Sequence, residues 1–406
     1  MMTKQKHIDI RKYLLEFNLN NKTDISTKEI DGITINIYSG EFWTSKQRQA
    51  NSLHEISYRA CFKPQLPCFF IELFTEVGDV VYDPFVGRGT TIIEAGLMNR
   101  NVIANDVNPL SKILCKPRLF IPDICQVSKR LEEINIDSLY KSEIDLTTFF
   151  HKETLNEIIT LQKYLDENDD DEINNWIRVV TTNRLTGHSK GFFSVYTLPP
   201  NQAVSLERQK ILNKKRNLKP EYRNVKQIIL KKSKQLTKDL SVQQIEQLKK
   251  IGKNAKFLNC DSAETFEIRN NSVQLTVTSP PYLDVVQYAN DNWLRFWFNN
   301  IDSKEMNNNI TITKNIIEWN CFMSLVFKEL YRITTIGGYV AFEVGDVKNG
   351  KIHLDEHIVR IGIRAGFECL GIMINQQNFT KTANIWGISN NMKGTNSNKI
   401  ILLKKS

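Results

Sequence analysis

Short apolar segments that alternate with helix-length stretches constrain the fold of this chain more than any other feature. Each segment has the length of a buried strand, and several are separated by intervals long enough for a helix. Strands joined in this way pair most economically as a parallel sheet with right-handed crossovers. The sequence therefore predicts an α/β fold with seven strands, over residues 79–82, 101–105, 256–259, 273–277, 338–344, 370–375 and 399–403.

The interval 120–255 has no strand-like alternation and carries most of the positive charge. The whole chain has a formal net charge of +9, and residues 205–256 alone hold sixteen Lys and Arg against four acidic residues, a balance of +12. Two interpretations are open: a solvated basic face, or a surface that contacts nucleic-acid phosphates. Arg184, His188 and Lys190, in a loop of the same interval, either contact nucleic acid or stabilise the loop through hydrogen bonds.

A glycine-containing loop follows the first predicted strand and opens a helix. It reads Asp83-Pro84-Phe85-Val86-Gly87-Arg88-Gly89-Thr90-Thr91. Its two glycines permit a positive φ and a close approach of the backbone to a ligand, and the free N–H groups of the helix start can receive a carboxylate. Thr90 or Thr91 is expected to cap the helix. A plain strand-to-helix turn would also explain these residues. The acidic residues at the ends of the predicted strands are therefore needed to distinguish a ligand site from a turn.

Three carboxylates, Asp83, Asp106 and Asp261, each follow one of the first three predicted strands. The carboxyl ends of parallel strands face the crevice where open α/β sheets bind ligands. Asp106, about twenty residues beyond the glycines, is placed to accept both hydroxyls of an adenosine ribose. Asp261 is placed to accept a hydrogen bond from the adenine amino group. The pattern predicts an adenosine-containing cofactor, and by itself it also permits a nicotinamide dinucleotide.

The segment Thr278-Ser279-Pro280-Pro281-Tyr282 ends the fourth predicted strand, where two prolines stop strand pairing and stiffen the chain. An exocyclic amino group is a poor nucleophile because its lone pair is delocalised into the ring. The Ser279 hydroxyl and the Pro280 carbonyl can accept its two N–H hydrogens, and Tyr282 can stack on a base that has left the duplex. The physical argument suits N4 of cytosine and N6 of adenine equally.

These motifs resemble those of the bacterial amino-methylating DNA methyltransferases of restriction-modification systems. In that family Asp-Pro-Phe-x-Gly-x-Gly-Thr-Thr is the S-adenosylmethionine loop, and Ser-Pro-Pro-Tyr is the catalytic loop most often seen with N4-cytosine modification. The resemblance extends through residues 62–67, 105–110 and 379–387. It implies that Phe62 and Pro64 lie near the methionine moiety of the cofactor. Asn384 and Trp386 are expected to line the target pocket.

The resemblance also implies the architecture. We expect a Rossmann-like class I methyltransferase fold: a seven-stranded, mostly parallel sheet with the last strand reversed, interrupted by a mainly helical insertion. The corresponding domains are an amino-terminal extension (1–42), a catalytic domain (43–119 plus 256–406) and a basic insertion (120–255) that is a candidate target-recognition region. The insertion separates the cofactor and catalytic halves, as a target-recognition region does in the family. It departs from the family in its position, because it falls between the second and third predicted strands, before Asp261, and not directly ahead of the catalytic strand.

The implied function is a site-specific methyltransferase that moves a methyl group from S-adenosyl-L-methionine to N4 of a flipped-out cytosine in duplex DNA. The alternatives are an N6-adenine DNA methyltransferase and, further off, an RNA methyltransferase or an inactive DNA-binding protein. Double-stranded DNA and a cognate restriction endonuclease are the implied partners.

Cofactors and location follow from the same sequence. Methyl transfer from a sulfonium needs no metal, and the seven cysteines are scattered without a Cys-x-x-Cys pair. We therefore expect no bound metal. No apolar run is long enough to cross a bilayer, which predicts a cytoplasmic protein without membrane partners.

Overall fold

The computed structural model describes residues 10–16, 23–43, 50–59, 61–136, 144–169, 171–198, 203–281, 288–303, 315–347, 352–375 and 398–406. Its strands are β1 (Asp24–Ile30), β2 (Ile33–Gly40), β3 (Val80–Asp83), β4 (Asn101–Asn105), β5 (Lys256–Leu258), β6 (Val273–Thr278), β7 (Thr334–Val344), β8 (Asp346–Val347), β9 (Ile352–His353), β10 (Glu368–Asn375) and β11 (Asn398–Lys404).

Its α-helices are α1 (Ile10–Glu16), α2 (Gln65–Phe74), α3 (Thr90–Leu97), α4 (Pro109–Cys115), α5 (Ile124–Glu133), α6 (Lys152–Glu167), α7 (Glu172–Arg184), α8 (Leu206–Arg216), α9 (Val225–Thr237), α10 (Val242–Asn254), α11 (Tyr288–Asp291), α12 (Trp293–Phe298), α14 (Ile316–Ile333) and α15 (Leu354–Ala365). Two short 3-10 helices are η2 (Ser52–His54) and η3 (Lys116–Leu119).

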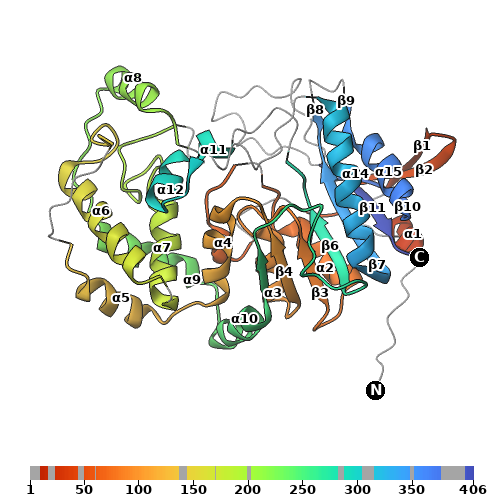
Figure 1. Ribbon diagram of the computed structural model, residues 1–406, viewed down its shortest axis with the longest axis horizontal. Helices are drawn as coiled ribbons and strands as arrows, with labels where there is room; N and C mark the ends of the chain where they lie inside the picture. The colour runs from red at the N-terminus through yellow and green to blue at the C-terminus, as the bar shows by residue number, and fades with distance from the viewer. Residues whose placement is uncertain are drawn as a thin grey trace.

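One large sheet forms the centre of the molecule, with the strand order β1-β2-β10-β11-β7-β6-β3-β4-β5 (Figure 1). The five strands from β7 to β5 are parallel to one another, and β11 runs antiparallel to both β7 and β10. All seven predicted strands are present, and the last strand of the chain is the reversed one. The predicted α/β fold, a mostly parallel Rossmann-like sheet, is therefore confirmed.

The sheet is larger than predicted because the amino-terminal extension adds a hairpin. β1 and β2 pair antiparallel around Asp31 and Gly32, whose φ values are 50° and 79°, and β2 then pairs in parallel with β10. Positive φ at both central residues is the geometry of a tight two-residue hairpin turn, for which Asp-Gly is a preferred sequence. Nine strands therefore replace the expected seven.

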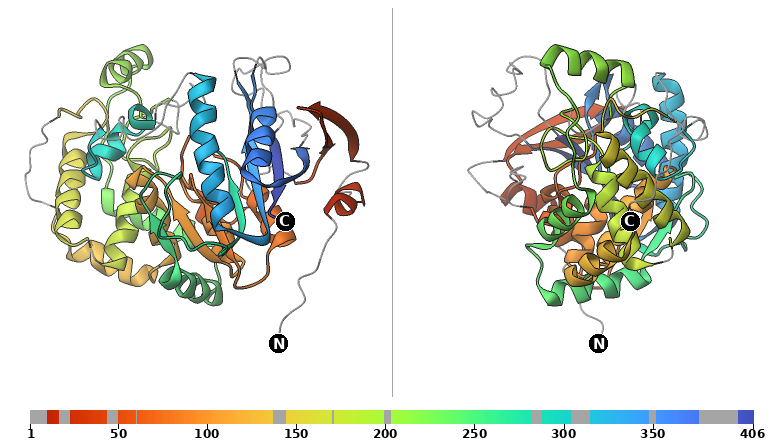
Figure 2. Two further views of the ribbon diagram at one scale, coloured as in Figure 1. Left: turned by 45° about the vertical axis from the view of Figure 1, so that its right-hand side comes forward. Right: turned by 90° about the vertical axis from the view of Figure 1, so that its left-hand side faces the viewer.

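Helices cover the two faces of the sheet, and each face has its own apolar core. The first core contains residues from α2, α3 and the helices of the 120–255 interval, and the second contains residues from α14 and α15. Figures 1 and 2 show α14 standing against the sheet on the opposite side from α3. Strands such as β3 and β6 are largely buried on both sides, which fits the apolar residues Val80, Val81, Val273, Leu275 and Val277 in their sequences.

The described part of the 120–255 interval is helical, from α5 to α10, and most of it forms a lobe beside the sheet (Figure 1). α10 differs from the other helices because it packs on α3 and β4 and leads directly into β5. It therefore serves as a crossover helix of the central sheet. Within the described ranges, no helix is both long and apolar enough to span a membrane.

Candidate active site

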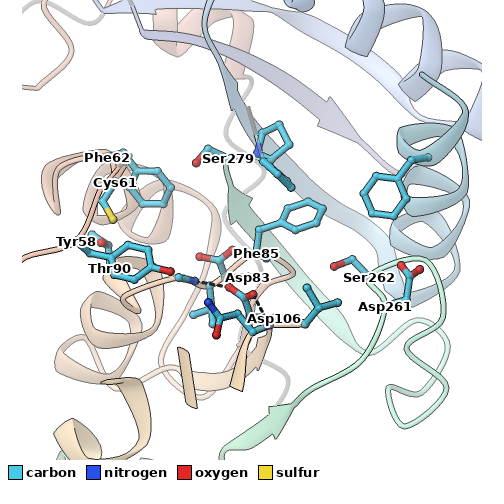
Figure 3. A pocket seen from close by; sticks show the side chains of 17 residues that line it. Tyr58, Cys61, Phe62, Asp83, Phe85, Thr90, Asp106, Asp261, Ser262 and Ser279 are labelled. Carbon is cyan, nitrogen blue, oxygen red and sulfur yellow. Dashed lines mark hydrogen bonds between the residues drawn. The ribbon is translucent and has the colours of Figure 1, made fainter. Parts of the chain in front are cut away.

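A pocket lies at the carboxyl ends of β3, β4 and β6, beside the segment that follows β5, and it brings together most of the predicted site residues (Figure 3). Figure 3 shows Asp83 and Asp106 in its middle, with Phe62 on one side and Asp261 on the other. The predicted residues that line it are Phe62, Asp83, Phe85, Gly87, Thr90, Asp106, Asp261, Ser279, Pro280 and Pro281. Pro64, Pro84, Gly89 and Thr91 are not among its lining residues.

Asp83 is the most deeply buried of the three predicted carboxylates, with 2% of its surface exposed. Its Oδ1 accepts hydrogen bonds from the Thr278 hydroxyl at 2.6 Å and from the Phe85 backbone N–H at 3.1 Å. Burial raises the pKa of Asp83 to about 7, and these hydrogen bonds act in the opposite direction. The bond to Thr278 joins the glycine-containing loop to the residue immediately before Ser279.

The glycine-containing loop turns through two residues with positive φ, Gly87 at 50° and Gly89 at 81°. A Cβ on Gly89 would lie 2.5 Å from the Cys115 sulfur, so this position needs glycine for space as well as for conformation. The expected threonine cap of α3 is wrong. Gly89 is the N-cap residue and has no side chain to cap with. The Thr91 hydroxyl instead donates to the Val277 carbonyl at 3.1 Å.

The Asp106 carboxylate is held by backbone N–H groups on both of its oxygens. Oδ2 accepts from Gly87 and Oδ1 from Asn108, each at 2.9 Å. Burial raises the pKa of Asp106, although both hydrogen bonds lower it. The Asn108 side-chain nitrogen is buried without a hydrogen-bond partner among the described residues, and Asn108 lines the pocket. A buried amide donor facing the pocket favours a polar ligand there.

Asp261 lies at the rim of the pocket and is exposed. Its Oδ1 accepts a hydrogen bond from the Ala263 backbone N–H at 2.9 Å. The adjacent Ser262 is buried, donates to the Pro84 carbonyl at 2.8 Å and thereby ties this segment to the glycine-containing loop. Pro84 thus contributes an acceptor to the packing of the site.

The segment Ser279–Pro281 extends beyond β6 along one wall of the pocket. The Trp319 indole N–H donates to the Pro281 carbonyl at 3.3 Å, which anchors the prolines to α14. Ser279 is half-buried, so its hydroxyl can accept a hydrogen bond from a ligand. Tyr282, Asn384 and Trp386, which were also predicted to serve the site, lie outside the described residues.

Sequence reasoning missed several residues that complete the walls of the pocket: Tyr58, Cys61, Val86, Val107, Asn108, Ser262 and Phe322. The sequence does indicate a structural role for Asn108, because an Asn before a proline is typical of a helix N-cap. Its side-chain oxygen accepts a hydrogen bond from the Leu110 N–H at 3.0 Å. No sequence pattern predicts that Tyr58 and Phe322 line the pocket. They reach the pocket only through tertiary packing, and Phe322 does so from α14.

Of the three candidate residues Arg184, His188 and Lys190, Arg184 packs within the protein, as expected of a residue that stabilises the loop. Arg184 is 9% exposed, its guanidinium lies 3.9 Å from the centre of the Phe192 ring, and its Nε donates to the Asn183 carbonyl. His188 and Lys190 are exposed.

Two sequence comparisons bear on this site. Residues 4–112 match the family model described as DNA methylase. The type II methyltransferase M.MjaII of Methanocaldococcus jannaschii is 32% identical over 100 residues, which cover 24% of this chain and 18% of that protein. The predicted resemblance to amino-methylating DNA methyltransferases is confirmed.

Further similarities cover more of the chain at lower identity. The type II methyltransferase M.BsoBI of Geobacillus stearothermophilus is 24% identical over 290 residues, 64% of this chain and 55% of that protein. The rRNA methyltransferase aviRa of Streptomyces viridochromogenes superposes with a TM-score of 0.35 at 10% identity, over 90% of this chain and 94% of that one, a likeness too low to bear on function. The chain thus spans about a fifth of the length of M.MjaII and about half of the length of M.BsoBI.

Proposed function

We propose that this protein is an S-adenosylmethionine-dependent DNA methyltransferase that methylates the N4 amino group of cytosine in duplex DNA. The observation that carries the proposal is the pocket itself. It joins the carboxylate at the end of β3 and those that follow β4 and β5 to the Ser279–Pro281 segment that follows β6. Sequence similarity to type II methyltransferases supports the same reaction class.

The residues present fit S-adenosylmethionine. Asp106 would accept the ribose hydroxyls, and the unpartnered side-chain nitrogen of Asn108 offers a donor close by. Apolar side chains, among them Phe85 and Phe322, supply walls for a purine ring. The positive φ of Gly87 brings the backbone of the loop close to the ligand space. When bound, the cofactor supplies an electrophilic methyl group on a sulfonium.

The chain's own contribution to the chemistry is orientation. The Ser279 hydroxyl and the Pro280 carbonyl would accept the two N–H hydrogens of the target amine and direct its lone pair towards the methyl donor. The amino nitrogen would then bond to the methyl carbon as the methyl–sulfur bond of the donor breaks, which leaves a neutral thioether, and the extra proton on the nitrogen would pass to water. Because the Trp319–Pro281 and Thr278–Asp83 hydrogen bonds hold the segment on both sides of Ser279, these acceptors are positioned before the base arrives.

The cytosine target rests on the serine at position 279, which the family resemblance associates with N4 modification. Adenine N6 is the alternative, because the same two acceptors serve either amine. Because the curated relatives are type II methyltransferases, the proposal includes a cognate restriction endonuclease as a partner. The described residues contain no cluster of three metal-ligating side chains, and no step of the proposed reaction calls for a metal.

Methylation of plasmid DNA by the purified protein tests the target atom. The treated DNA is digested to nucleosides and analysed by mass spectrometry, with total RNA treated in parallel. N4-methylcytosine in DNA is the expected product. N6-methyladenine alone would overturn the cytosine assignment, and methyl incorporation into RNA alone would overturn the DNA assignment.

A further inference from the structure

The basic run 205–256 is divided in the structure between helices at opposite ends of the molecule. α8 lies at the top of Figure 1, on the same side as α11, which follows the catalytic segment. α10 lies at the bottom and ends one residue before β5 begins, so it is at the amino-terminal edge of the parallel strands. The pocket is at their carboxyl-terminal edge, so α8 and α10 cannot both face the same ligand beside it.

α8 is physically tied to the neighbourhood of the pocket. The backbone N–H of Ala203 donates to the Asp291 carbonyl at 2.8 Å, and the Trp293 indole N–H donates to the Val204 carbonyl at 3.0 Å. Asp291 also accepts from Arg59 at 2.7 Å, next to the pocket residue Tyr58. The start of α8 is therefore fixed to α11 and α12 and, through them, to the wall of the pocket.

A polar groove lies where these segments meet. The start of α8, including Arg208 and the acidic Glu207, forms one wall, and Asn290, Asp291 and Trp293 form the other. The Asp291 carboxylate is neutralised by Arg59, so Glu207 is the one acid of the groove that has no ion pair among the described residues. Arg208 and four further basic residues of α8 leave the helix with a charge of +4 after Glu207 is counted.

Few charges of α8 are explained by the packing of the protein: Arg216 lies over the Tyr196 ring at 4.6 Å, and Lys210 is near enough to Asp145 and Glu207 to lower the pKa of both. Only Gln209 of this helix is buried, and neither Arg208 nor Lys210 makes an ion pair with a described residue. Both lie in the first half of the helix, where the dipole disfavours positive charge, and Lys210 has a like charge four residues on at Lys214.

Some basic residues of the other two helices of the run are paired within the protein. Lys232 of α9 pairs with Glu55 at 2.9 Å, Lys226 of α9 donates to the Ile134 carbonyl, and Lys249 of α10 pairs with Glu172 at 3.2 Å. A helix that buries almost nothing and keeps a net charge of +4 is typical of a surface for a polyanion.

We propose that α8 and the groove at its base bind the phosphate backbone of duplex DNA beside the base that enters the pocket, and that α10 takes no part. The inference rests on the proposed function, because it assigns the surface on which that enzyme's DNA substrate lies. Arg208 and Lys210 supply the phosphate contacts nearest the groove. The solvated-face interpretation therefore applies to α10 and not to α8.

Two matched double variants of the full-length protein test the assignment. R208Q/K210Q removes two charges from α8, and K250Q/K253Q removes two exposed charges from α10. Binding of a fluorescent duplex of mixed sequence is measured by anisotropy across a salt series from about 50 to about 200 mM. Each lost phosphate contact lowers the slope of log K against log salt by about 0.9, so the α8 variant should lose up to about 1.8. The α10 variant should keep the wild-type slope.

The outcomes separate this inference from the function on which it rests. An unchanged slope in the α8 variant, or equal changes in both variants, overturns the α8 surface while DNA binding by the wild type stands. A wild type that binds no DNA overturns the proposed function itself. Thermal melting of both variants serves as the folding control, and we expect wild-type values because Gln keeps the helix propensity and neither helix buries these side chains.

Discussion

Thr278→Val tests the hydrogen bond that connects the glycine-containing loop to the end of β6. The Thr278 hydroxyl donates to Asp83 at 2.6 Å, and both residues are buried. Valine keeps the shape of the side chain and removes the donor. A hydrogen bond to a charged group contributes about 1.5–3 kcal/mol and one to a neutral group about 0.5–1.5 kcal/mol. Because burial raises the pKa of Asp83 to about 7, the cost depends on the pH.

The direction of the pH dependence follows from where Asp83 holds its proton. Its pKa in the folded protein, about 7, is above the ordinary value of 3.8, so between these values the native state keeps a proton that the unfolded chain has released. The stability that Asp83 contributes therefore falls as the pH rises from 3.8 to about 7, and it is constant above that. The Thr278 hydroxyl lowers this pKa, so its removal extends the fall to higher pH.

Urea unfolding of the wild type and the variant measures the effect. We expect Thr278→Val to lower the free energy of unfolding by about 1 kcal/mol near about pH 6 and by about 2–3 kcal/mol near about pH 8.5. Thr278→Ser, which keeps the hydroxyl, should recover most of the pH-dependent part.

Thr276→Val is the matched control for this experiment. Thr276 is buried on the same strand, and its hydroxyl has no hydrogen-bond partner among the described residues. Its replacement should be neutral or stabilising, because it removes a buried hydroxyl that makes no hydrogen bond. An equal loss at both pH values for Thr278→Val, or an equal loss in both valine variants, would contradict the reasoning.

Four further substitutions test other parts of the protein. Asp106→Ala should weaken S-adenosylmethionine binding by about 10- to 100-fold in calorimetry, whereas Tyr282→Ala should lower turnover and leave that affinity near wild type; similar losses of affinity would refute the division of labour. Gly89→Ala places a Cβ 2.5 Å from the Cys115 sulfur and should lower the free energy of unfolding in urea by about 1–3 kcal/mol; an unchanged value would contradict the close packing at this position. Burial raises the pKa of Glu343 to about 8, so Glu343→Gln should gain stability over wild type as the pH rises from 4.5 to about 8, and parallel pH profiles would contradict this.

The central sheet was predictable because its strands are buried on both faces. β3, β4 and β6 are short segments rich in Val, Ile and Leu, and such segments predict a buried strand even when the neighbouring strands are not known. The β1–β2 hairpin was missed because β1 is an edge strand with mostly exposed residues, so its sequence lacks an apolar face. The signal that could have revealed it was Asp31-Gly32 followed by the alternating pattern of β2.

The site was predictable where backbone geometry dictates residue type and unpredictable where distant segments meet. Gly87 and Gly89 were assigned from the need for positive φ, and both have it. The threonine cap of α3 failed because the preceding glycine occupies the cap position, which leaves Thr91 free to bond to β6. Tyr58 and Phe322 reach the pocket from segments without a motif, so only the folded chain shows them.

The structure adds to the motifs the way in which they are connected. Thr278 and Asp83 are separated by 195 residues and share a 2.6 Å hydrogen bond, and Thr91 reaches Val277 across 186 residues. Each bond links the glycine-containing loop to the last residues of β6, immediately before Ser279. A displacement of the loop on one strand therefore moves the acceptors on the other. Since a near-attack geometry tolerates little misplacement, we infer that these two buried hydroxyls set the alignment between methyl donor and amine. In the proposed reaction, the alignment would thus depend on the sheet that joins the two motifs, not on either motif alone.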